Sequence, residues 1–196
     1  MKGQDRADEL TFKALEQAIS PQEVLTLGLK PGMEKVGKKF SENKIFVPQM
    51  LMSAKAMSTA LMHLKPHFLS GAARQKGVFI IGTVSGDLHD IGKNLVGMMV
   101  EGSGYKVIDL GVDVNSEKFI AAVKENPGAV VGLSALLTTT MVNMESITKD
   151  IKDAVSGTVI TIGGAPVNEE FCRKIGADNY SPDPQGVVDF LNKRNT

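Results

Sequence analysis

The chain has 196 residues, of which 42% are hydrophobic and 22% charged, and its 22 Lys/Arg residues balance 22 Asp/Glu residues. This composition is typical of a globular protein with one large domain or two small ones. A formal net charge of zero lacks the basic excess that binding to a nucleic-acid backbone requires. We therefore expect no nucleic-acid partner and no polyanionic one.

Cysteine content and the apolar segments bear on the cellular compartment. The single cysteine, Cys172, excludes an intramolecular disulfide and any metal site built from several thiolates. The first ten residues lack the apolar core of a signal peptide, and the longest apolar stretch, residues 129–137, is too short to cross a bilayer. These features predict a cytoplasmic protein without a membrane segment.

The first part of the chain has a helical pattern. Ser20, Pro21 and Glu23 have the spacing of a capping box at the start of a helix. Apolar residues recur at helical spacing over residues 47–64, and breaks at residues 31–32 and 41–44 predict about four helices in a small bundle. The five methionines of residues 33–62 fit the core of such a bundle, with a cofactor-facing surface as the alternative.

Charge and hydrophobic period both change near residues 70–77. Residues 1–76 carry an excess of five positive charges and residues 77–196 an excess of five negative charges. The small and polar residues of 70–77 suit a linker. We expect a helical domain over residues 1–75 and a second domain over residues 76–196, with the linker as a hinge.

The second part alternates between strands and helices. Short apolar runs at residues 78–84, 106–110, 129–133 and 158–162 are each followed by a helical segment, and a last short run at 178–180 precedes a helix over 184–193. The pattern predicts an α/β protein in which an N-terminal helical bundle precedes a five-stranded parallel sheet. The expected type is flavodoxin-like or Rossmann-like, with strand order 2-1-3-4-5.

Ligands of such sheets bind beyond the carboxyl ends of the strands, which directs attention to residues 85–94, 134–140 and 163–166. The first of these loops is not a Walker A loop, because five residues separate Gly86 from Gly92 and Asn94 follows Lys93. It also lacks the glycine spacing of a dinucleotide fingerprint. A phosphate-accepting receiver domain would need an acidic residue at the end of the third strand, where the chain has Ser134.

The same loop carries His89 between Asp87 and Asp90. A carboxylate that holds one imidazole nitrogen is a recurring arrangement at metal-ligating histidines. One histidine is too few for a zinc site, and we interpret His63 and His67 as part of a solvated helix face. A single histidine ligand suits a metal that arrives in a macrocycle with its own four donors.

Four segments together resemble a known family: residues 86–94, 109–112, 132–138 and 163–165. They are similar to the cobalamin-binding domain of methionine synthase. They resemble more closely the small stand-alone corrinoid proteins of methanol, methylamine, glycine betaine and methoxyaromatic methyltransferase systems. Residues 32–40 and 46–50 resemble the helical cap that these proteins place over the corrin.

The resemblance implies a role for each matching residue. His89 would be the axial ligand of the corrinoid cobalt, with Asp87 and then Thr140 continuing a hydrogen-bonded relay from its imidazole. Ser134 and Thr138 would bind the buried nucleotide base. The other positions implied in cofactor binding are Gly86, Asp90, Ile91, Gly92, Leu136, Gly163, Gly164, Ala165 and Tyr180, with Phe40, Val47 and Met50 from the cap.

The implied function is that of a corrinoid-carrying methyl-transfer subunit, which is not catalytic on its own. It would accept a methyl group from a substrate:corrinoid methyltransferase and deliver it to a second methyltransferase that serves tetrahydrofolate or coenzyme M, with a reductive activase as a further partner. One alternative is a cobalamin-responsive regulator that acts through a partner protein. Two others are a mutase subunit that uses adenosylcobalamin, which would not need a cap such as residues 40–50, and a binding module without corrinoid.

Overall fold

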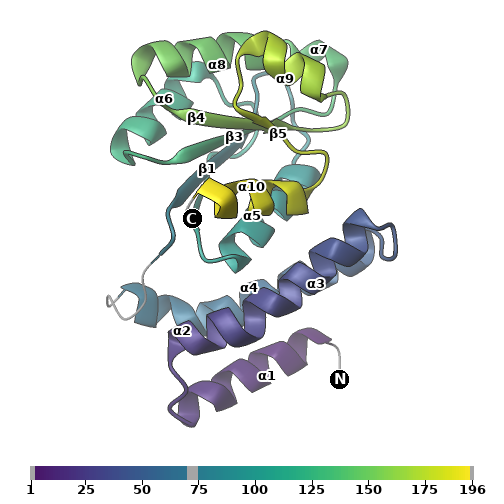
Figure 1. Cartoon of the computed structure of the whole chain (residues 1–196), viewed down its shortest axis with the longest axis vertical. Helices are drawn as coiled ribbons and strands as arrows, with labels where there is room; N and C mark the ends of the chain where they lie inside the picture. The colour runs from purple at the N-terminus through teal and green to yellow at the C-terminus, as the bar shows by residue number, and fades with distance from the viewer. Residues whose placement is uncertain (1–2, 70–74, 195–196) are drawn as a thin grey trace. The chain divides into compact units, whose positions relative to one another are not determined.

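The computed structural model describes residues 3–69 and 75–194 (Figure 1). The chain forms two compact units. One consists of the residues up to Lys76 together with Met98–Tyr105, and the other of Gly77–Gly97 and the residues from Lys106 onward. Residues 98–105 thus pack with the helical unit although the expected division assigned them to the second domain. No helix among the described residues combines the length and the apolar character that a bilayer span requires.

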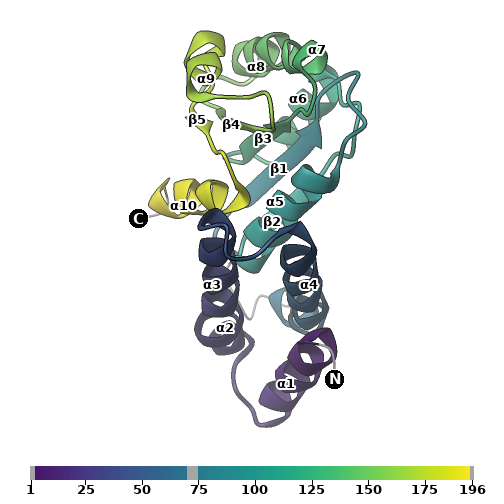
Figure 2. The same ribbon diagram turned by 90° about the vertical axis from the view of Figure 1, so that its right-hand side faces the viewer.

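The described part of the helical unit is built from helical rods (Figure 2). They are α1 (Gly3–Glu16), a continuous path through α2 (Pro21–Glu23), the π-helix η1 (Val24–Leu29) and α3 (Lys30–Ser41), and α4 (Val47–Leu69). The expected capping box is present, because the Glu23 amide donates to Ser20 Oγ and the Ser20 amide donates to Glu23 Oε2. Helix α1 packs chiefly against α4.

The break expected at residues 31–32 is wrong, since the path continues helically through Pro31. Proline has no amide hydrogen and is best tolerated in the first turn of a helix. Pro31 lies in the first turn of α3, directly after a π-helix whose last hydrogen bond runs from the Lys30 amide to the Leu25 carbonyl. The π-helical turn shifts the backbone hydrogen-bond pattern directly before the proline. Helices α2, η1 and α3 therefore follow one another without an intervening loop.

The second unit has the expected parallel sheet, with strand order β2-β1-β3-β4-β5. In chain order its elements are β1 (Val78–Thr83), α5 (Ile91–Gly102), β2 (Lys106–Asp109), α6 (Ser116–Glu125), β3 (Val130–Ser134), α7 (Thr138–Met141), α8 (Asn143–Ala154), β4 (Val159–Gly163), α9 (Glu169–Ile175), β5 (Asn179–Tyr180) and α10 (Pro184–Arg194). Helices α6, α8 and α9 cover one face of the sheet, and the first part of α5 covers the other with α10 (Figures 1 and 2).

Two aromatic side chains fill the space above glycines in the central strands. A Cβ built on Gly132 of β3 would lie 2.6 Å from the Phe79 ring, and one on Gly82 of β1 would lie 2.7 Å from the Phe119 ring. Both rings are fully buried. Neither glycine therefore has room for a side chain. Strands β1 and β3 are direct neighbours, so the loops that follow them meet at the carboxyl edge of the sheet.

Candidate functional site

Asp87 is the centre of a dense set of hydrogen bonds at the carboxyl edge of the sheet. Its side chain is completely buried. One oxygen, Oδ1, accepts from the His89 amide at 3.0 Å and lies 2.7 Å from His89 Nδ1. The other, Oδ2, accepts from the Thr140 hydroxyl at 2.6 Å and from the Leu136 and Leu137 amides at 2.8 and 3.4 Å. The contact joins the loop after β1 to the loop after β3.

These donors keep Asp87 ionised. Burial by itself raises the pKa of a carboxyl group, but the Thr140 hydroxyl, the amides of Leu136 and His89, and the His89 imidazole lower the pKa of Asp87 well below its usual range. A carboxylate can only accept hydrogen bonds, so the proton of a neutral His89 imidazole lies on Nδ1. Nε2 then has a free lone pair, and it has no hydrogen-bonding partner among the described residues.

Backbone contacts hold the loop that carries His89. Gly86 has a φ of +81°, which favours glycine, and its amide donates to Asp113 Oδ1 at 2.7 Å. The Thr83 hydroxyl donates to the His89 carbonyl at 2.9 Å, and Asn143 Nδ2 donates to the Ser85 carbonyl at 2.8 Å. Sequence reasoning missed Thr83, Asp113 and Asn143; Thr83 ends β1, but Asp113 and Asn143 lie farther along the chain, with no sequence signal for their role.

Apolar side chains are exposed on the loops and helix ends around His89. The imidazole is itself half-exposed, with 51% of its side-chain surface accessible. Leu88 is 72% exposed and Ile91 63%, both next to His89 in the chain. The other exposed members of this apolar rim are Val112, Leu136, Leu137 and Val142. Exposed apolar side chains gathered around a ligating group indicate a ligand with a large apolar surface.

The donor set fits a metal held in a macrocycle. Among the residues that the structure describes, no group of three or more His, Cys, Asp or Glu side chains could hold a bare ion. His89 Nε2 alone points to a metal whose other donors come with the ligand. A corrin ring meets this condition, and the apolar surface of its macrocycle would fit the apolar rim.

The segment at the end of β4 approaches neighbouring backbone so closely that it depends on glycine. Gly164 has a φ of +131°, and a Cβ there would lie 1.8 Å from the Ala135 carbonyl oxygen. A Cβ on Gly163 would lie 3.2 Å from the Ser181 carbonyl oxygen. The hydroxyls of Ser134 and Thr138 have no hydrogen-bonding partner in the described part of the chain. These two hydroxyls, at the end of β3 and the start of α7, can therefore bond to a polar group of a ligand.

The remaining residues expected at the site differ in their contacts. Asp90 does not bond to His89; its carboxylate accepts from Asn94 Nδ2 at 2.9 Å. Tyr180 is half-buried in β5 and pairs in register with Ile162 of β4. Gly92 and Ala165 are exposed, the first in the opening turn of α5 and the second after β4.

In the helical unit, the three residues expected to face the corrin differ in exposure. Val47 is 41% exposed and Phe40 half-buried, whereas Met50 is completely buried. Of the five methionines, Met33 and Met57 are also buried, so three of them follow the core interpretation. Met52 and Met62 are 62% and 60% exposed.

The interpretation of His63 as part of a solvated helix face is wrong. Its Nε2 lies 2.5 Å from Asp8 Oδ1, and its ring contacts Phe12 with centroids 5.9 Å apart. Asp8 and Phe12 belong to α1, 55 and 51 residues earlier, so no local pattern in the sequence indicates the pair. His63 therefore joins α4 to α1.

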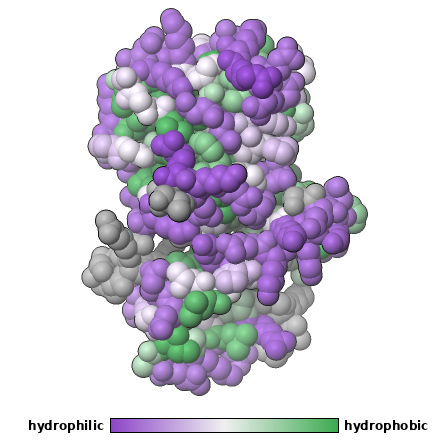
Figure 3. All heavy atoms as spheres, in the orientation of Figure 1, coloured by the Kyte–Doolittle hydropathy of each residue, from purple (hydrophilic) through white to green (hydrophobic). Residues whose placement is uncertain are grey.

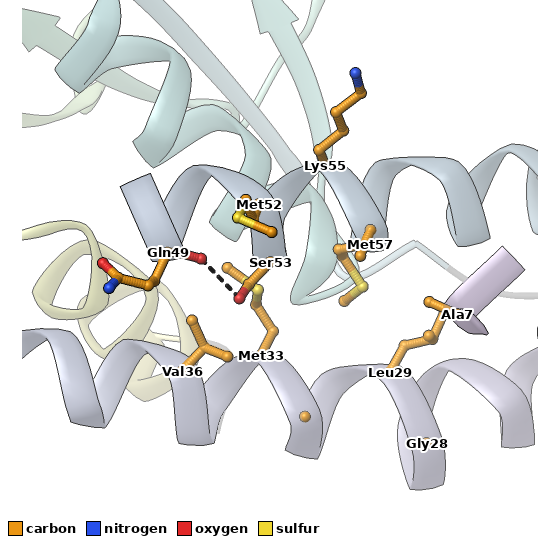
Figure 4. Close-up of a pocket in the computed structure, with 12 residues that line it drawn as sticks. Ala7, Gly28, Leu29, Met33, Val36, Gln49, Met52, Ser53, Lys55 and Met57 are labelled. Carbon is orange, nitrogen blue, oxygen red and sulfur yellow. Dashed lines mark hydrogen bonds between the residues drawn. The ribbon is translucent and has the colours of Figure 1, made fainter. Parts of the chain in front are cut away.

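The helical unit also contains an open cavity of about 750 Å³ between α1, α3 and α4 (Figure 4). Met33 and Val36 of α3 line it opposite Ser53 and Met57 of α4, while Lys55 points away. Its lining is mainly apolar, and the Ser53 hydroxyl is occupied by the Gln49 carbonyl at 2.9 Å. Further hydrophobic side chains are exposed over α1 and η1 (Figure 3).

Family comparisons agree with both units. Residues 77–185 match the family model described as a B12 binding domain, and residues 4–65 match a second model with the same description. The fold and the site therefore define a B12-binding protein, with the helical unit as part of the binding module.

Curated relatives make the family more specific. The chain is 36% identical to a corrinoid protein of Desulfitobacterium hafniense, over 97% of this chain and 90% of the relative. It is 41% identical to the trimethylamine corrinoid protein of Methanosarcina barkeri, over 93% of this chain and 86% of the relative. The chain belongs to the family of B12-binding corrinoid proteins.

Solved structures give the same result. A cobalamin-binding protein from Desulfitobacterium hafniense superposes with a TM-score of 0.80 at 32% identity, covering 98% of this chain and 92% of the other. The methanol:cobalamin methyltransferase complex MtaBC from Methanosarcina barkeri matches with a TM-score of 0.84 at 30% identity, covering 98% and 74%.

Proposed function

We propose that this protein is a corrinoid-carrying methyl-transfer subunit in which His89 Nε2 is the lower axial ligand of the cobalt. A bound corrinoid supplies the cobalt centre that accepts and releases the methyl group. The observation that carries the proposal is the buried Asp87 carboxylate, 2.7 Å from His89 Nδ1, which leaves Nε2 free on a half-exposed ring.

The relay gives His89 an adjustable donor strength. Asp87 Oδ1 holds the Nδ1 proton, and this increases the electron density at Nε2. The Thr140 hydroxyl donates to Asp87 Oδ2 at 2.6 Å and moderates the carboxylate charge. A ligand that draws more electron density from Nε2 would strengthen the hydrogen bond from Nδ1 to Asp87 Oδ1, and a ligand that draws less would weaken it. The relay thus follows the electron demand at the axial position.

The methyl donor and acceptor would be bound by partner proteins. The polar groups that surround His89 are used to hold the loop and the imidazole, which leaves the apolar rim for the cofactor. We propose a substrate:corrinoid methyltransferase and a second methyltransferase serving tetrahydrofolate or coenzyme M as the two partners, with a reductive activase for repair. The polypeptide then contributes the cofactor site, and the partners contribute the substrate pockets.

The helical unit would protect the upper face of the corrin. Phe40 and Val47 are apolar and at least partly exposed, so both can exclude water between transfers. A completely buried Met50 supports the packing of α4 in this arrangement. Transfer to a partner requires the helices to move away, and the expected hinge is the linker at residues 70–77, of which 70–74 lie outside the described residues.

The test is anaerobic reconstitution with cobalamin, followed by desalting and an absorption spectrum of the protein fraction. Wild type is expected to retain one corrinoid per chain with the spectrum of a histidine-ligated, base-off form. His89→Gly is expected to retain some corrinoid and lose the histidine-ligated spectrum, while His67→Ala, a control on an exposed part of α4, matches wild type. A colourless wild-type protein would contradict the function, and an unchanged His89→Gly spectrum would remove His89 from the axial position.

A further inference from the structure

Lys93 is a buried lysine that the proposed mechanism does not use. It lies in the first turn of α5, four residues after His89, and only 2% of its side chain is exposed. Its Nζ donates to Asp109 Oδ2 at 2.5 Å and to Asn94 Oδ1 at 2.6 Å. A buried ammonium group needs such partners, because an unpaired charge in the protein interior is strongly unfavourable.

The Lys93–Asp109 pair closes a ring of hydrogen bonds around the backbone of His89. Asp109 Oδ1 accepts from the Gly111 amide at 2.8 Å. The Gly111 carbonyl accepts from the Thr83 amide at 3.0 Å, and the Thr83 hydroxyl donates to the His89 carbonyl at 2.9 Å. The ring returns to Lys93 through the chain itself, so the end of β2 is connected to His89 from both sides.

A second branch holds the residue after His89. Asn94, which accepts from Lys93, donates through Nδ2 to Asp90 Oδ2 at 2.9 Å, and its amide donates to the Asp90 carbonyl at 2.8 Å. Lys93 therefore contacts both supports of the His89 loop: β2 through Asp109 and the start of α5 through Asn94.

A lysine after a glycine-rich loop often binds a phosphate group. That role does not fit Lys93, since its Nζ has two side-chain acceptors and its surface is covered. The carboxylate partner is the exposed member of the pair, with 44% of its side chain accessible. The Lys93 ammonium group therefore bonds within the protein and is not exposed to a ligand.

We propose that Lys93 is a positioning residue for His89, holding the loop at the end of β2 so that the imidazole stays oriented whether or not Nε2 has a ligand. The purpose assigned to this anchor rests on the proposed function, because a carrier whose axial bond changes needs a loop that does not relax when the bond weakens. The anchor itself is a property of the protein without cofactor and can be tested there.

The experiment compares Lys93→Met and Asp109→Asn with Lys149→Met, an exposed lysine on α8 paired only at 3.9 Å with Asp153. The readout is backbone hydrogen exchange of the His89 amide in the cofactor-free protein, measured by NMR relative to the amide of Val131 in β3. Both site variants are expected to accelerate exchange at His89 by about tenfold or more relative to Val131, as loss of a charge-assisted hydrogen bond predicts. Lys149→Met is expected to leave the ratio unchanged.

An equal acceleration at His89 and Val131 would show a purely structural role and overturn the proposal, as would exchange that is unchanged at both amides. If Lys93→Met does not fold, Asp109→Asn decides by the same criterion, because asparagine keeps an oxygen for the Gly111 amide while removing the charge partner. After reconstitution with cobalamin, the histidine-ligated fraction of the bound corrinoid should also fall in both variants. A wild type that binds no corrinoid would refute the function and leave the exchange result to decide the role of Lys93.

Discussion

Replacing Asp87 by asparagine tests the electrostatic account of the site most directly. The Asp87 carboxylate accepts five hydrogen bonds, two at Oδ1 and three at Oδ2. An asparagine amide has one oxygen and one NH₂ group. In the variant, the donors that bond to one of the two carboxylate oxygens in wild type therefore lose their acceptor. With NH₂ toward β3, the Leu136 and Leu137 amides lose their partner. With NH₂ toward His89, the imidazole must accept at Nδ1 and carry its proton on Nε2.

Either orientation is costly. An unsatisfied buried donor costs about 1–3 kcal/mol, and at least one strong bond and one weaker bond are lost, so we expect Asp87→Asn to destabilise the protein by about 2–4 kcal/mol. For a chain of this length that corresponds to a fall in Tm of about 5–15 °C. Asp90→Asn is the matched control, because the Asp90 carboxylate is exposed and bonds only to Asn94 among the described residues.

Thermal unfolding followed by circular dichroism measures the stability difference, and ¹⁵N NMR of the imidazole reports which nitrogen carries the proton. The control is expected within about 0.5 kcal/mol of wild type. If Asp87→Asn is as stable as Asp90→Asn and keeps the proton on Nδ1, the buried carboxylate neither stabilises the loop nor selects the tautomer, and the reasoning fails.

The pH dependence of stability and two glycine positions offer three further tests. Folding lowers the pKa of Asp87, so the stabilisation by its carboxylate is present above the unfolded pKa of about 3.9 and is lost as pH falls through the folded pKa. In urea titrations, the unfolding free energies of wild type and Asp87→Asn should therefore converge below about pH 4. Gly164→Ala should lower the unfolding free energy measured in urea by more than about 3 kcal/mol. The control Gly176→Ala, at a position with positive φ but no clash, should lower it by about 1–2 kcal/mol. Equal losses would contradict the close contact with Ala135. Gly32→Ala, in an open helical position, should raise stability by about 0.4–1 kcal/mol, and a loss would contradict the free space beside it.

The sheet could be predicted from the sequence because its inner strands β1, β3 and β4 are buried on both faces and read as continuous apolar runs. Strand β1 is expected at residues 78–84 and found at Val78–Thr83, and even the two-residue β5 lies within the expected segment 178–180. The helical unit was less predictable. Whether Pro31 ends a helix depends on the hydrogen-bond phase of the preceding turn, and a π-helix in that turn has no sequence signature as clear as a proline.

The site was predictable where a local motif carried it. Asp87 and His89 are two residues apart, and a carboxylate beside a histidine has a chemical meaning by itself. Thr140 is 53 residues from Asp87, and only the family resemblance brought the two together. Asp8 and His63 are 55 residues apart without such a resemblance, so their contact was missed. The burial of Lys93 against Asp109 is likewise a tertiary property that spacing does not reveal.

Around His89, the polar groups are bonded within the protein and the exposed side chains are apolar, which fits a ligand with an apolar face. The polar side chains beneath the imidazole are satisfied within the protein, so ligand binding breaks none of their hydrogen bonds. Leu88 and Ile91 are left 72% and 63% exposed, and covering the rest of both side chains would contribute about 2–4 kcal/mol at roughly 1.5–3 kcal/mol per fully buried residue. If His89 is the axial ligand as proposed, the apolar rim would retain the cofactor when that bond weakens.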